Sequence, residues 1–233
     1  MKLELLSNSS GNWDIYRMIE EKTSAAFIIR FPKMNIGETK INSYINNYKI
    51  IHDLGLPTLV IVEKVTCCCG KLGIKTEDLN YSKDTIYVTH NSVYSDSRKK
   101  VDELSQSFNK ITLDKKISEY EEFRYRNKLK EITNFYEFIK STKEKLKVAS
   151  EHSIHIDYDS YFFGTSNKSK SSEIDYKIVD LDNIFANKDQ SFNEIHNYNI
   201  NEFHDAINGF IKYFVESKNQ SLYYENATTF LKK

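Results

Sequence analysis

The sequence predicts an α+β fold in two parts, and three patterns in the chain predict it. Short apolar runs of strand type fill the first 80 residues, with one interval of helical spacing among them. Helical spacing dominates the last half of the chain, where two short strands interrupt it. The pattern changes near residue 80. We therefore expect two domains, 1–80 with an antiparallel sheet and one helix, and 81–233 mainly helical with a hairpin at 154–184.

In the first part we expect strands around a single helix. Ile41, Tyr44, Tyr48 and Ile51 follow helical spacing, and Gly55 ends the helix. Pro32 ends the strand before it, because proline has no N–H to donate to a sheet. The predicted order is strand Lys2–Leu6, strand Trp13–Glu20, strand Ser24–Phe31, helix Lys40–Leu54, strand Leu59–Val65 and strand Lys71–Thr76.

Composition and charge narrow the class of protein. The chain is 39% hydrophobic and 13% aromatic with 7 Gly and 2 Pro, which is typical of a folded protein. Its formal net charge is zero, so no overall field attracts nucleic acid or an anionic membrane. The sequence has no apolar run of about 20 residues and no signal-peptide pattern at its start. We expect a soluble cytoplasmic protein, or one delivered by a route that the sequence does not show, without nucleic-acid or membrane partners.

Three consecutive cysteines, Cys67, Cys68 and Cys69, stand between two predicted strands. A zinc site needs ligands that converge on a tetrahedron, whereas adjacent residues of a strand point to opposite faces. We therefore expect a strand end rather than a metal site, and no disulfide framework.

The second part begins with a weak pattern and ends with a strong one. Thr85–Val88 is a possible short strand, and 96–126 is charged and long for a connector. We interpret that stretch as a solvated insertion, with a recognition element as the alternative. A stripe from Ile132 to Leu146 predicts one helix. The clearest helix has apolar residues at Phe203, Ala206, Ile207, Phe210, Ile211, Phe214 and Val215.

Aspartates gather beside two short apolar segments of the second part. Asp157 and Asp159 precede the strand around Tyr161–Phe163, and Asp180 and Asp182 follow the strand Tyr176–Val179. The polar stretch 166–172 lets these strands pair as a hairpin, which brings the acids together. Carboxylates so placed can hold Mg²⁺ or accept a proton from an attacking hydroxyl. The simpler interpretation is that such aspartates form turns and cap helices.

These elements and motifs resemble the protein-kinase-like superfamily, in an atypical small form. Ile156-Asp157 followed by Phe162-Phe163 is similar to the catalytic loop of that family, and Val179-Asp180-Leu181-Asp182 is similar to its metal-binding Asp-Phe-Gly segment. The stretch 48–58 resembles the end of the regulatory helix, and 77–79 resembles the hinge beside the adenine. The resemblance covers most of the chain in order and spacing and implies a two-lobed fold, with a sheet lobe and a helical lobe.

The resemblance also implies roles for particular residues. Asp157 orients the acceptor hydroxyl, and Arg30 neutralises phosphate in the place of the usual lysine. ATP and Mg²⁺ are the implied cofactors and a nucleotide the implied partner. The implied metal ligands are Asp180, Asp182 and Asp159, and the implied nucleotide-binding residues are Arg30, Gly11, Glu77 and Leu79. We expect the side-chain ends of Asp157, Asp180 and Arg30 to lie within about 10 Å, a span that one Mg²⁺-nucleotide can bridge.

Several family features are missing. The Gly-rich loop keeps only Gly11, the regulatory helix has no central Glu, and Phe162 stands where the catalytic-loop Asn is expected. An inactive pseudokinase that binds a protein partner is therefore the alternative to an active phosphotransferase. A metal-dependent nuclease is a third class. It is disfavoured because Lys177 precedes Asp180 rather than following it, and because the net charge is neutral.

Overall fold

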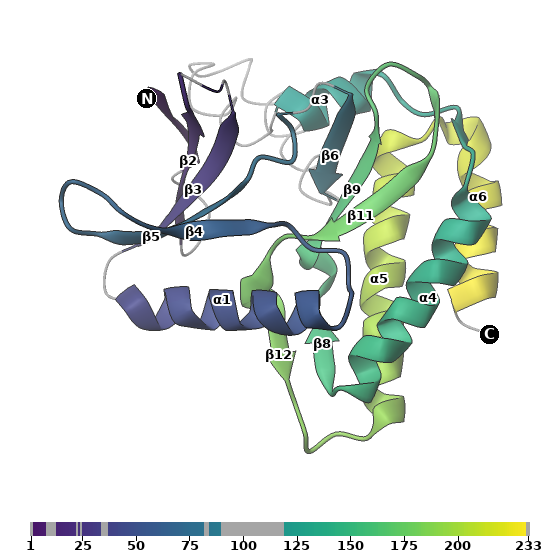
Figure 1. Cartoon of the computed structure of the whole chain (residues 1–233). Helices are drawn as coiled ribbons and strands as arrows, with labels where there is room; N and C mark the ends of the chain where they lie inside the picture. The colour runs from purple at the N-terminus through teal and green to yellow at the C-terminus, as the bar shows by residue number, and fades with distance from the viewer. Residues whose placement is uncertain are drawn as a thin grey trace, which may run out of the picture. The chain divides into compact units, whose positions relative to one another are not determined.

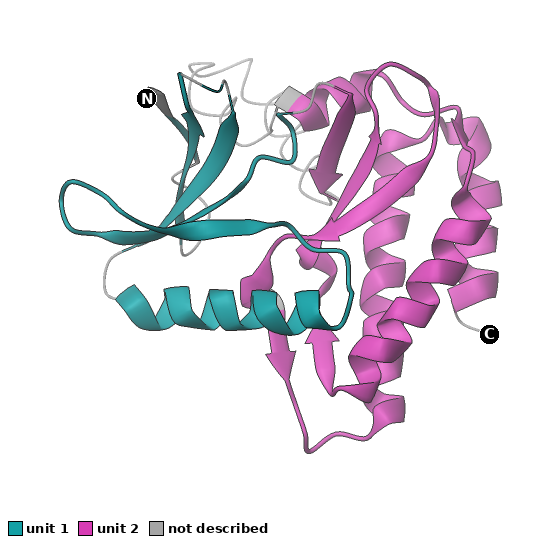
Figure 2. Ribbon diagram, in the orientation of Figure 1, with its two compact units in different colours: residues 1–81 teal, residues 82–233 magenta. Residues whose placement is uncertain are grey.

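The computed structural model describes residues 2–7, 13–21, 23, 25–33, 37–81, 84–89 and 119–231. Gly11 and most of the 96–126 stretch lie outside these residues. The chain divides into two compact units, Met1–Tyr81 and Ser82–Lys233 (Figure 2). Each unit is described by itself.

The first unit is an antiparallel sheet with one helix. Its strands follow the spatial order β1-β2-β3-β5-β4, so β5 is inserted between β3 and β4 (Figure 1). The elements are β1 (Lys2–Ser7), β2 (Trp13–Ile19), β3 (Ala26–Pro32), α1 (Gly37–Asp53), β4 (Ile61–Thr66) and β5 (Leu72–Glu77). This is the predicted order of strands and helix, so the α+β class is confirmed.

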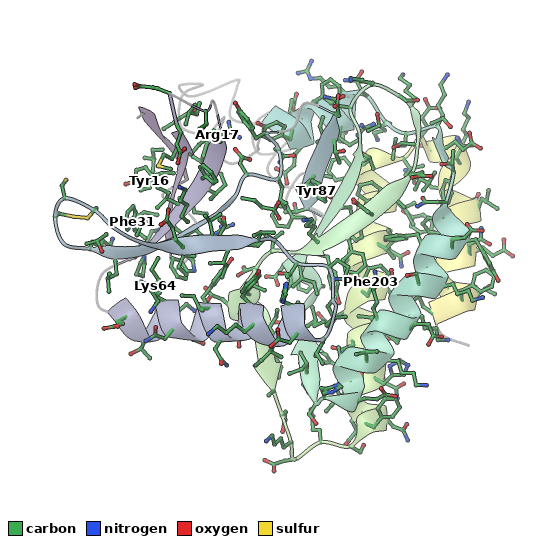
Figure 3. All side chains as sticks on the ribbon, in the orientation of Figure 1. Tyr16, Arg17, Phe31, Lys64, Tyr87 and Phe203 are labelled. Atoms are coloured by element: carbon green, nitrogen blue, oxygen red, sulfur yellow. A yellow bond between two sulfur atoms is a disulfide. The ribbon has the colours of Figure 1, made fainter. Side chains whose placement is uncertain are left out.

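Helix α1 packs against the sheet through its apolar stripe. Ile41, Tyr44 and Ile51 are buried, and the ring of Tyr44 meets that of Trp13 edge-on at 5.5 Å. The exposed side of the helix contributes Asn42, whose carbonyl oxygen accepts a hydrogen bond from Lys64 of β4 at 2.9 Å (Figure 3). One stripe of helical spacing is thus enough to fix the helix to the sheet.

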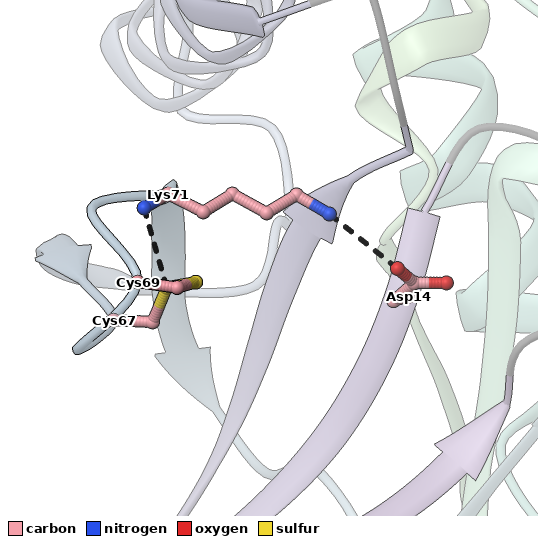
Figure 4. The surroundings of a disulfide bond; sticks show 4 residues. All are labelled: Asp14, Cys67, Cys69 and Lys71. Atoms are coloured by element: carbon pink, nitrogen blue, oxygen red, sulfur yellow. Dashed lines mark hydrogen bonds and ion pairs between the residues drawn. A yellow bond between two sulfur atoms is a disulfide. The ribbon is translucent and has the colours of Figure 1, made fainter.

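The turn between β4 and β5 corrects the expectation for the cysteines. They follow the end of β4, and Cys67 forms a disulfide with Cys69 while Cys68 is exposed and free (Figure 4). The backbone N–H of Lys71 donates to Cys67 Sγ at 3.2 Å, and the Lys71 ammonium approaches Asp14 at 3.5 Å. The argument from alternating strand faces failed because the residues form a turn, which lets the first and third side chains meet.

The second unit is mainly helical, with short sheets on one side. Its sheets are β11-β9-β6, β12-β8 and β10-β7. Two 3₁₀ helices, η1 and η2, follow β8 and β11. The elements are β6 (Thr85–Thr89), α3 (Glu119–Arg126), β7 (Glu131–Ile132), α4 (Phe135–Glu151), β8 (Ile154–Ile156), η1 (Tyr158–Ser160), β9 (Tyr161–Ser166), β10 (Ser171–Ser172), β11 (Ile174–Ile178), η2 (Leu181–Asn183), β12 (Ile184–Ala186), α5 (Phe192–Phe214) and α6 (Ser217–Leu231).

Aromatic rings pack around Phe203 of α5, which is labelled in Figure 3. The Phe203 ring lies 5.1 Å from Tyr161, 5.7 Å from Tyr176 and 6.0 Å from Phe138 between ring centroids. Phe203 is fully buried. Burial of rings this large dominates the stability of a core. The predicted apolar stripe of α5 is the face that makes these contacts.

Strands β9 and β11 form an antiparallel hairpin with Tyr161 opposite Ile178, in agreement with the predicted pairing. Strand β6 joins β9 on its other side, where Tyr87 donates a hydrogen bond to Asp175 at 2.8 Å (Figure 3). A side chain at Gly164 would place its Cβ 2.6 Å from the Tyr87 ring. Glycine is therefore required where β9 passes between its two neighbours.

The described end of the 96–126 stretch is not a solvated insertion. Residues Glu119–Arg126 form helix α3, and the Arg124 side chain is 1% exposed. Its guanidinium donates to the carbonyl oxygens of Asn127 and Ser166. Burial lowers the pKa of Arg124 to about 10. The charge count suggested solvent exposure, but two backbone carbonyls accept hydrogen bonds from the Nη atoms of this cation inside the unit.

Among the described residues, no helix is both long enough and apolar enough to span a membrane.

Candidate functional site

The two aspartate segments lie next to each other in the second unit. Asp157 follows β8 and precedes η1, while Asp180 follows β11 and precedes η2. Ser160 connects them, because its carbonyl oxygen accepts the Val179 N–H at 2.8 Å and its hydroxyl donates to the Asp180 carbonyl at 3.1 Å. Strands β8 and β12 then pair with Ile156 opposite Ile184. The second aspartate segment is therefore fixed to the first at both of its ends.

Asp157 is half-buried and oriented from α5. The Tyr198 hydroxyl donates a hydrogen bond to its Oδ1 atom. The next residue, Tyr158, donates its backbone N–H to Glu202 at 2.9 Å. His155 packs face to face with Phe185 at 4.6 Å and edge-on to Tyr198, and burial lowers its pKa below the ordinary 6.5. A neutral imidazole thus supports the strand that presents Asp157.

Asp180 caps η2, since its Oδ1 atom accepts the Asp182 N–H at 3.3 Å. Asp182 is half-buried and Asp159 is exposed. Among the described residues, no group of three or more His, Cys, Asp or Glu side chains forms a metal cage. Proteins usually hold Mg²⁺ in phosphotransferases through one or two carboxylates together with substrate phosphates. Two aspartates alone would need oxygen atoms from a substrate to complete the shell of a metal ion, so Mg²⁺ at this place stays a prediction.

Arg30 lies on β3 of the first unit, at the position expected for the phosphate-binding cation. Its Nη1 donates to Thr76 Oγ1 at 2.8 Å, and its guanidinium carbon lies 6.0 Å from the centroid of the Tyr44 ring. Thr76 is fully buried. The guanidinium is thus oriented by β5 on one side and by Tyr44 of α1 on the other.

The predicted hinge residues lie at the end of β5 and just after it. Glu77 ends that strand, and its Oε1 atom accepts the Val60 N–H at 2.9 Å. Asp78 accepts a hydrogen bond from Arg17 Nε at 2.6 Å (Figure 3), and the turn then passes through half-buried Leu79. Gly11 lies outside the described residues. Arg30, Glu77 and Leu79 belong to the first unit and the four aspartates to the second, so their convergence on one nucleotide stays a prediction.

A pocket beside Asp157 contains residues that the motif analysis missed. Its volume is about 650 Å³, within the range of small-molecule sites. Tyr198, Glu202, Asp205 and Gly209 of α5 contribute to its wall. These residues are spaced by four, three and four, so they form one stripe of the helix. That polar stripe was visible in the sequence beside the apolar stripe of the same helix, and could have been found there.

The electrostatics of this pocket are set by its acids. Burial raises the pKa of Glu202, and the nearby carboxylates of Asp157, Asp205 and Asp159 raise it further. Burial and the bond to Asp157 also raise the pKa of the Tyr198 hydroxyl, so this group donates a proton to the hydrogen bond at neutral pH. Ionising these neighbouring carboxylates together therefore costs free energy.

Comparison with known proteins gives likenesses in structure but none in sequence. No family model matches the chain, and no curated protein is similar to it in sequence. The structure is similar to that of choline kinase LicA from Streptococcus pneumoniae, with a TM-score of 0.39 and 14% sequence identity. The likeness covers 97% of this chain and 75% of LicA. A likeness this distant assigns neither an activity nor a substrate.

Proposed function

We propose that the protein is an atypical kinase-like phosphotransferase that uses ATP and Mg²⁺. The observation that supports it best is the Ser160 junction, which fixes two aspartate-bearing segments side by side in the second unit. Asp157 leaves one strand next to a pocket that can receive an acceptor, and Asp180 leaves the neighbouring strand. The sheet unit before them has the strand and helix order of a kinase sheet lobe and presents Arg30 from β3.

In this proposal each residue has one task. Asp157 accepts the proton of the acceptor hydroxyl on its Oδ2 atom, while Tyr198 holds Oδ1 and fixes the carboxylate plane. Asp180 holds the metal with Asp182 or Asp159, and bound Mg²⁺ would neutralise the charge that develops on the transferred phosphoryl group. Arg30 adds positive charge from the first unit. Catalysis in this class is mostly positioning and charge stabilisation, which a small set of residues can supply.

A pseudokinase is the second candidate function, and the surroundings of Arg30 favour it. The guanidinium donates to buried Thr76 and lies near Tyr44 rather than near a glutamate of α1. Phe162 stands on β9 in place of the second metal-binding side chain. A chain that binds nucleotide without transferring phosphate, and that acts by binding a protein partner, would have these features.

Titration with Mg²⁺-ATP and thermal unfolding separates the candidates. We expect ATP to raise the melting temperature only when Mg²⁺ is present, and Asp180→Asn to remove that rise. Asparagine keeps an oxygen that can accept the Asp182 N–H, so η2 remains capped. The control is Asp189→Asn, an exposed change of the same kind that should leave the rise intact.

Phosphoryl transfer is measured next. Release of ADP by the wild type, reduced at least about 100-fold in Asp157→Asn, supports the phosphotransferase. Nucleotide binding without ADP release supports the pseudokinase. Absence of any Mg²⁺-ATP effect on the wild type contradicts the phosphotransferase and supports a pseudokinase that acts only by binding a protein partner.

A further inference from the structure

We infer that the turn between β4 and β5 is a site of reversible thiol–disulfide exchange, at which a small thiol compound opens and re-forms the Cys67–Cys69 bridge. This inference goes beyond the proposed phosphotransferase and does not depend on it. Three features carry it: the bridge closes a very short loop, backbone hydrogen bonds hold the turn, and the two cysteines differ in exposure.

The bridge is poorly suited to a structural role. Cys67 and Cys69 are two positions apart in the sequence, and their Cα atoms lie 5.3 Å apart. A disulfide stabilises a fold mainly by restricting the unfolded chain, and this effect grows with the length of the loop that it closes. A loop with a single residue between its ends restricts the unfolded chain only weakly. A chemical role therefore explains this bridge better than a structural one.

The turn is held by its own backbone. The Gly70 N–H donates to the Cys67 carbonyl oxygen at 2.9 Å, and the Cys67 N–H donates to the Lys71 carbonyl oxygen at 2.9 Å. Gly70 has a φ of +80°, which glycine adopts without strain. Next to the turn, Thr66 of β4 pairs with Leu72 of β5. These contacts involve no sulfur atom, so we expect them to persist in the reduced chain and to keep the two thiols close enough to re-form the bridge.

The two sulfur atoms have different surroundings, which sets the direction of the exchange. Cys69 is exposed, whereas Cys67 is half-buried. The Lys71 backbone N–H donates to Cys67 Sγ at 3.2 Å, and a hydrogen bond of this kind favours the thiolate form of the sulfur. The Lys71 side chain extends away from the bridge toward Asp14, so the backbone alone supplies this contact (Figure 4). A thiol from solution therefore attacks Cys69, and Cys67 is the leaving group.

The exchange balances in atoms and electrons, with glutathione as the thiol. A glutathione thiolate forms a bond to Cys69 Sγ, the Cys67–Cys69 bond breaks, and Cys67 leaves as a thiolate that takes up a proton. A second glutathione thiolate attacks the glutathione sulfur of this mixed disulfide and releases Cys69. The bridge gains two electrons and becomes two thiols, while two glutathione molecules become glutathione disulfide. The reverse steps, with glutathione disulfide as the oxidant, re-form the bridge.

The third cysteine, Cys68, is an exposed free thiol beside the pair. Its own reaction with glutathione would overlap with that of the bridge. The experiments therefore use Cys68→Ser, which keeps the bridge and leaves no other cysteine, because the chain has 3 in all.

Thiol counting in glutathione buffers tests the inference on the full folded chain. In Cys68→Ser we expect the free thiols to rise from none to both as reduced glutathione increases, and to return to none when glutathione disulfide is restored. The same titration in concentrated guanidinium chloride gives the unfolded reference. Because the folded turn keeps the two thiols together, we expect the bridge to form about tenfold more favourably in the folded chain.

A matched variant tests the role of Cys67. Cys67→Ser/Cys68→Ser keeps Cys69 alone, so glutathione that attaches there has no neighbouring thiol to displace it. After treatment with glutathione disulfide, we expect this variant to retain at least about tenfold more glutathione than Cys68→Ser, as mass spectrometry of the intact chain will show.

Four results would overturn the inference. A bridge that resists every glutathione ratio until the chain unfolds would be structural, and so would a bridge whose reduction unfolds the chain, as circular dichroism would show. Equal bridging in the folded and unfolded chains would mean that the turn does not hold the thiols together. Equal retention of glutathione in the two variants would mean that Cys67 does not resolve the mixed disulfide.

Discussion

The two units surround their acids in different ways. In the first unit three acids each meet a cation: Lys75 Nζ lies 3.1 Å from both Glu20 and Glu63, and Arg17 Nε lies 2.6 Å from Asp78. In the second unit the carboxylates of the pocket stand near one another with Lys212 as the cation among the described lining residues. Paired opposite charges stabilise a fold, whereas neighbouring carboxylates disfavour each other's ionised form and cost stability.

The pKa of an acid is shifted in opposite directions in the two units. Hydrogen bonding to Lys75 lowers the pKa of Glu20, so the folded chain favours its charged form. Burial and neighbouring acids raise the pKa of Glu202, so the folded chain disfavours its charged form. Substitutions in the two clusters should therefore change stability with opposite sign at neutral pH.

The largest effect is expected at Arg17. In Arg17→Met the side chain of Asp78, which is 4% exposed, loses its cation and keeps only the Asn80 N–H as a donor that the structure records. Breaking a buried pair on one side leaves a buried charge and costs about 3 kcal/mol or more. Denaturant unfolding of the two proteins measures this difference.

The matched control is Arg126→Met on α3. Arg126 pairs with Glu122 four residues before it and is 67% exposed, so its loss should cost about 0.5 kcal/mol or less. Equal costs for the two arginine variants would show that the first unit does not depend on its balanced charges.

An intermediate effect is expected from Lys75→Met. Methionine keeps the apolar contact with Phe27, whose ring centroid lies 4.0 Å from the Lys75 ammonium, but it removes the partner of Glu20 and Glu63. Both glutamates are partly exposed and can be hydrated, so we expect a loss of about 1 kcal/mol at pH 7.

The pH dependence of Lys75→Met gives a second check. Because the pKa of Glu20 is lowered, its contribution is present above its unfolded value of 4.5 and is lost as the pH falls through the folded value. The gap between variant and wild type should therefore close in acid. A gap that stays constant from pH 7 to pH 3.5 would mean that packing, not the ion pair, is responsible.

The fold was largely predictable because its elements have strong local patterns. The apolar stripe of α5 predicts a helix because Phe203, Ile207 and Phe210 repeat at helical spacing. These residues form the buried face of the helix. The order of strands around α1 followed from apolar runs bounded by turns. Strands β8 and β12 were missed, since three residues each are too short to show a period.

The candidate site was predictable only where motifs lie close in the sequence. Asp157 and Asp180 were found because each stands next to an apolar strand, and the Ser160 contacts bring their segments together. Tyr213 and Tyr224 were not found, since they reach the pocket from distant turns of α5 and α6. The end of the 96–126 stretch was misinterpreted because composition cannot show that backbone carbonyl oxygens will accept hydrogen bonds from Arg124.

The smallest expected effect is also the one that best tests the unbalanced cluster. In Glu202→Gln the new amide oxygen can still accept the Tyr158 N–H, while the repulsion from Asp157 and Asp205 disappears. Like charges three residues apart on a helix cost up to about 0.5 kcal/mol, so we expect the melting temperature at pH 7 to rise by roughly 1–2 °C.

The sign and pH window of this gain are fixed by the raised pKa of Glu202. A raised pKa means that the wild type is destabilised only above the unfolded value of 4.5, where the carboxylate begins to ionise in the unfolded chain. The gain in Glu202→Gln should therefore be present at pH 7 and fade toward pH 4, as thermal unfolding across that range will show. A variant less stable than wild type at pH 7 would mean that Glu202 is a structural acid like Glu20. The carboxylate of Glu202 would then stabilise the fold rather than destabilise it.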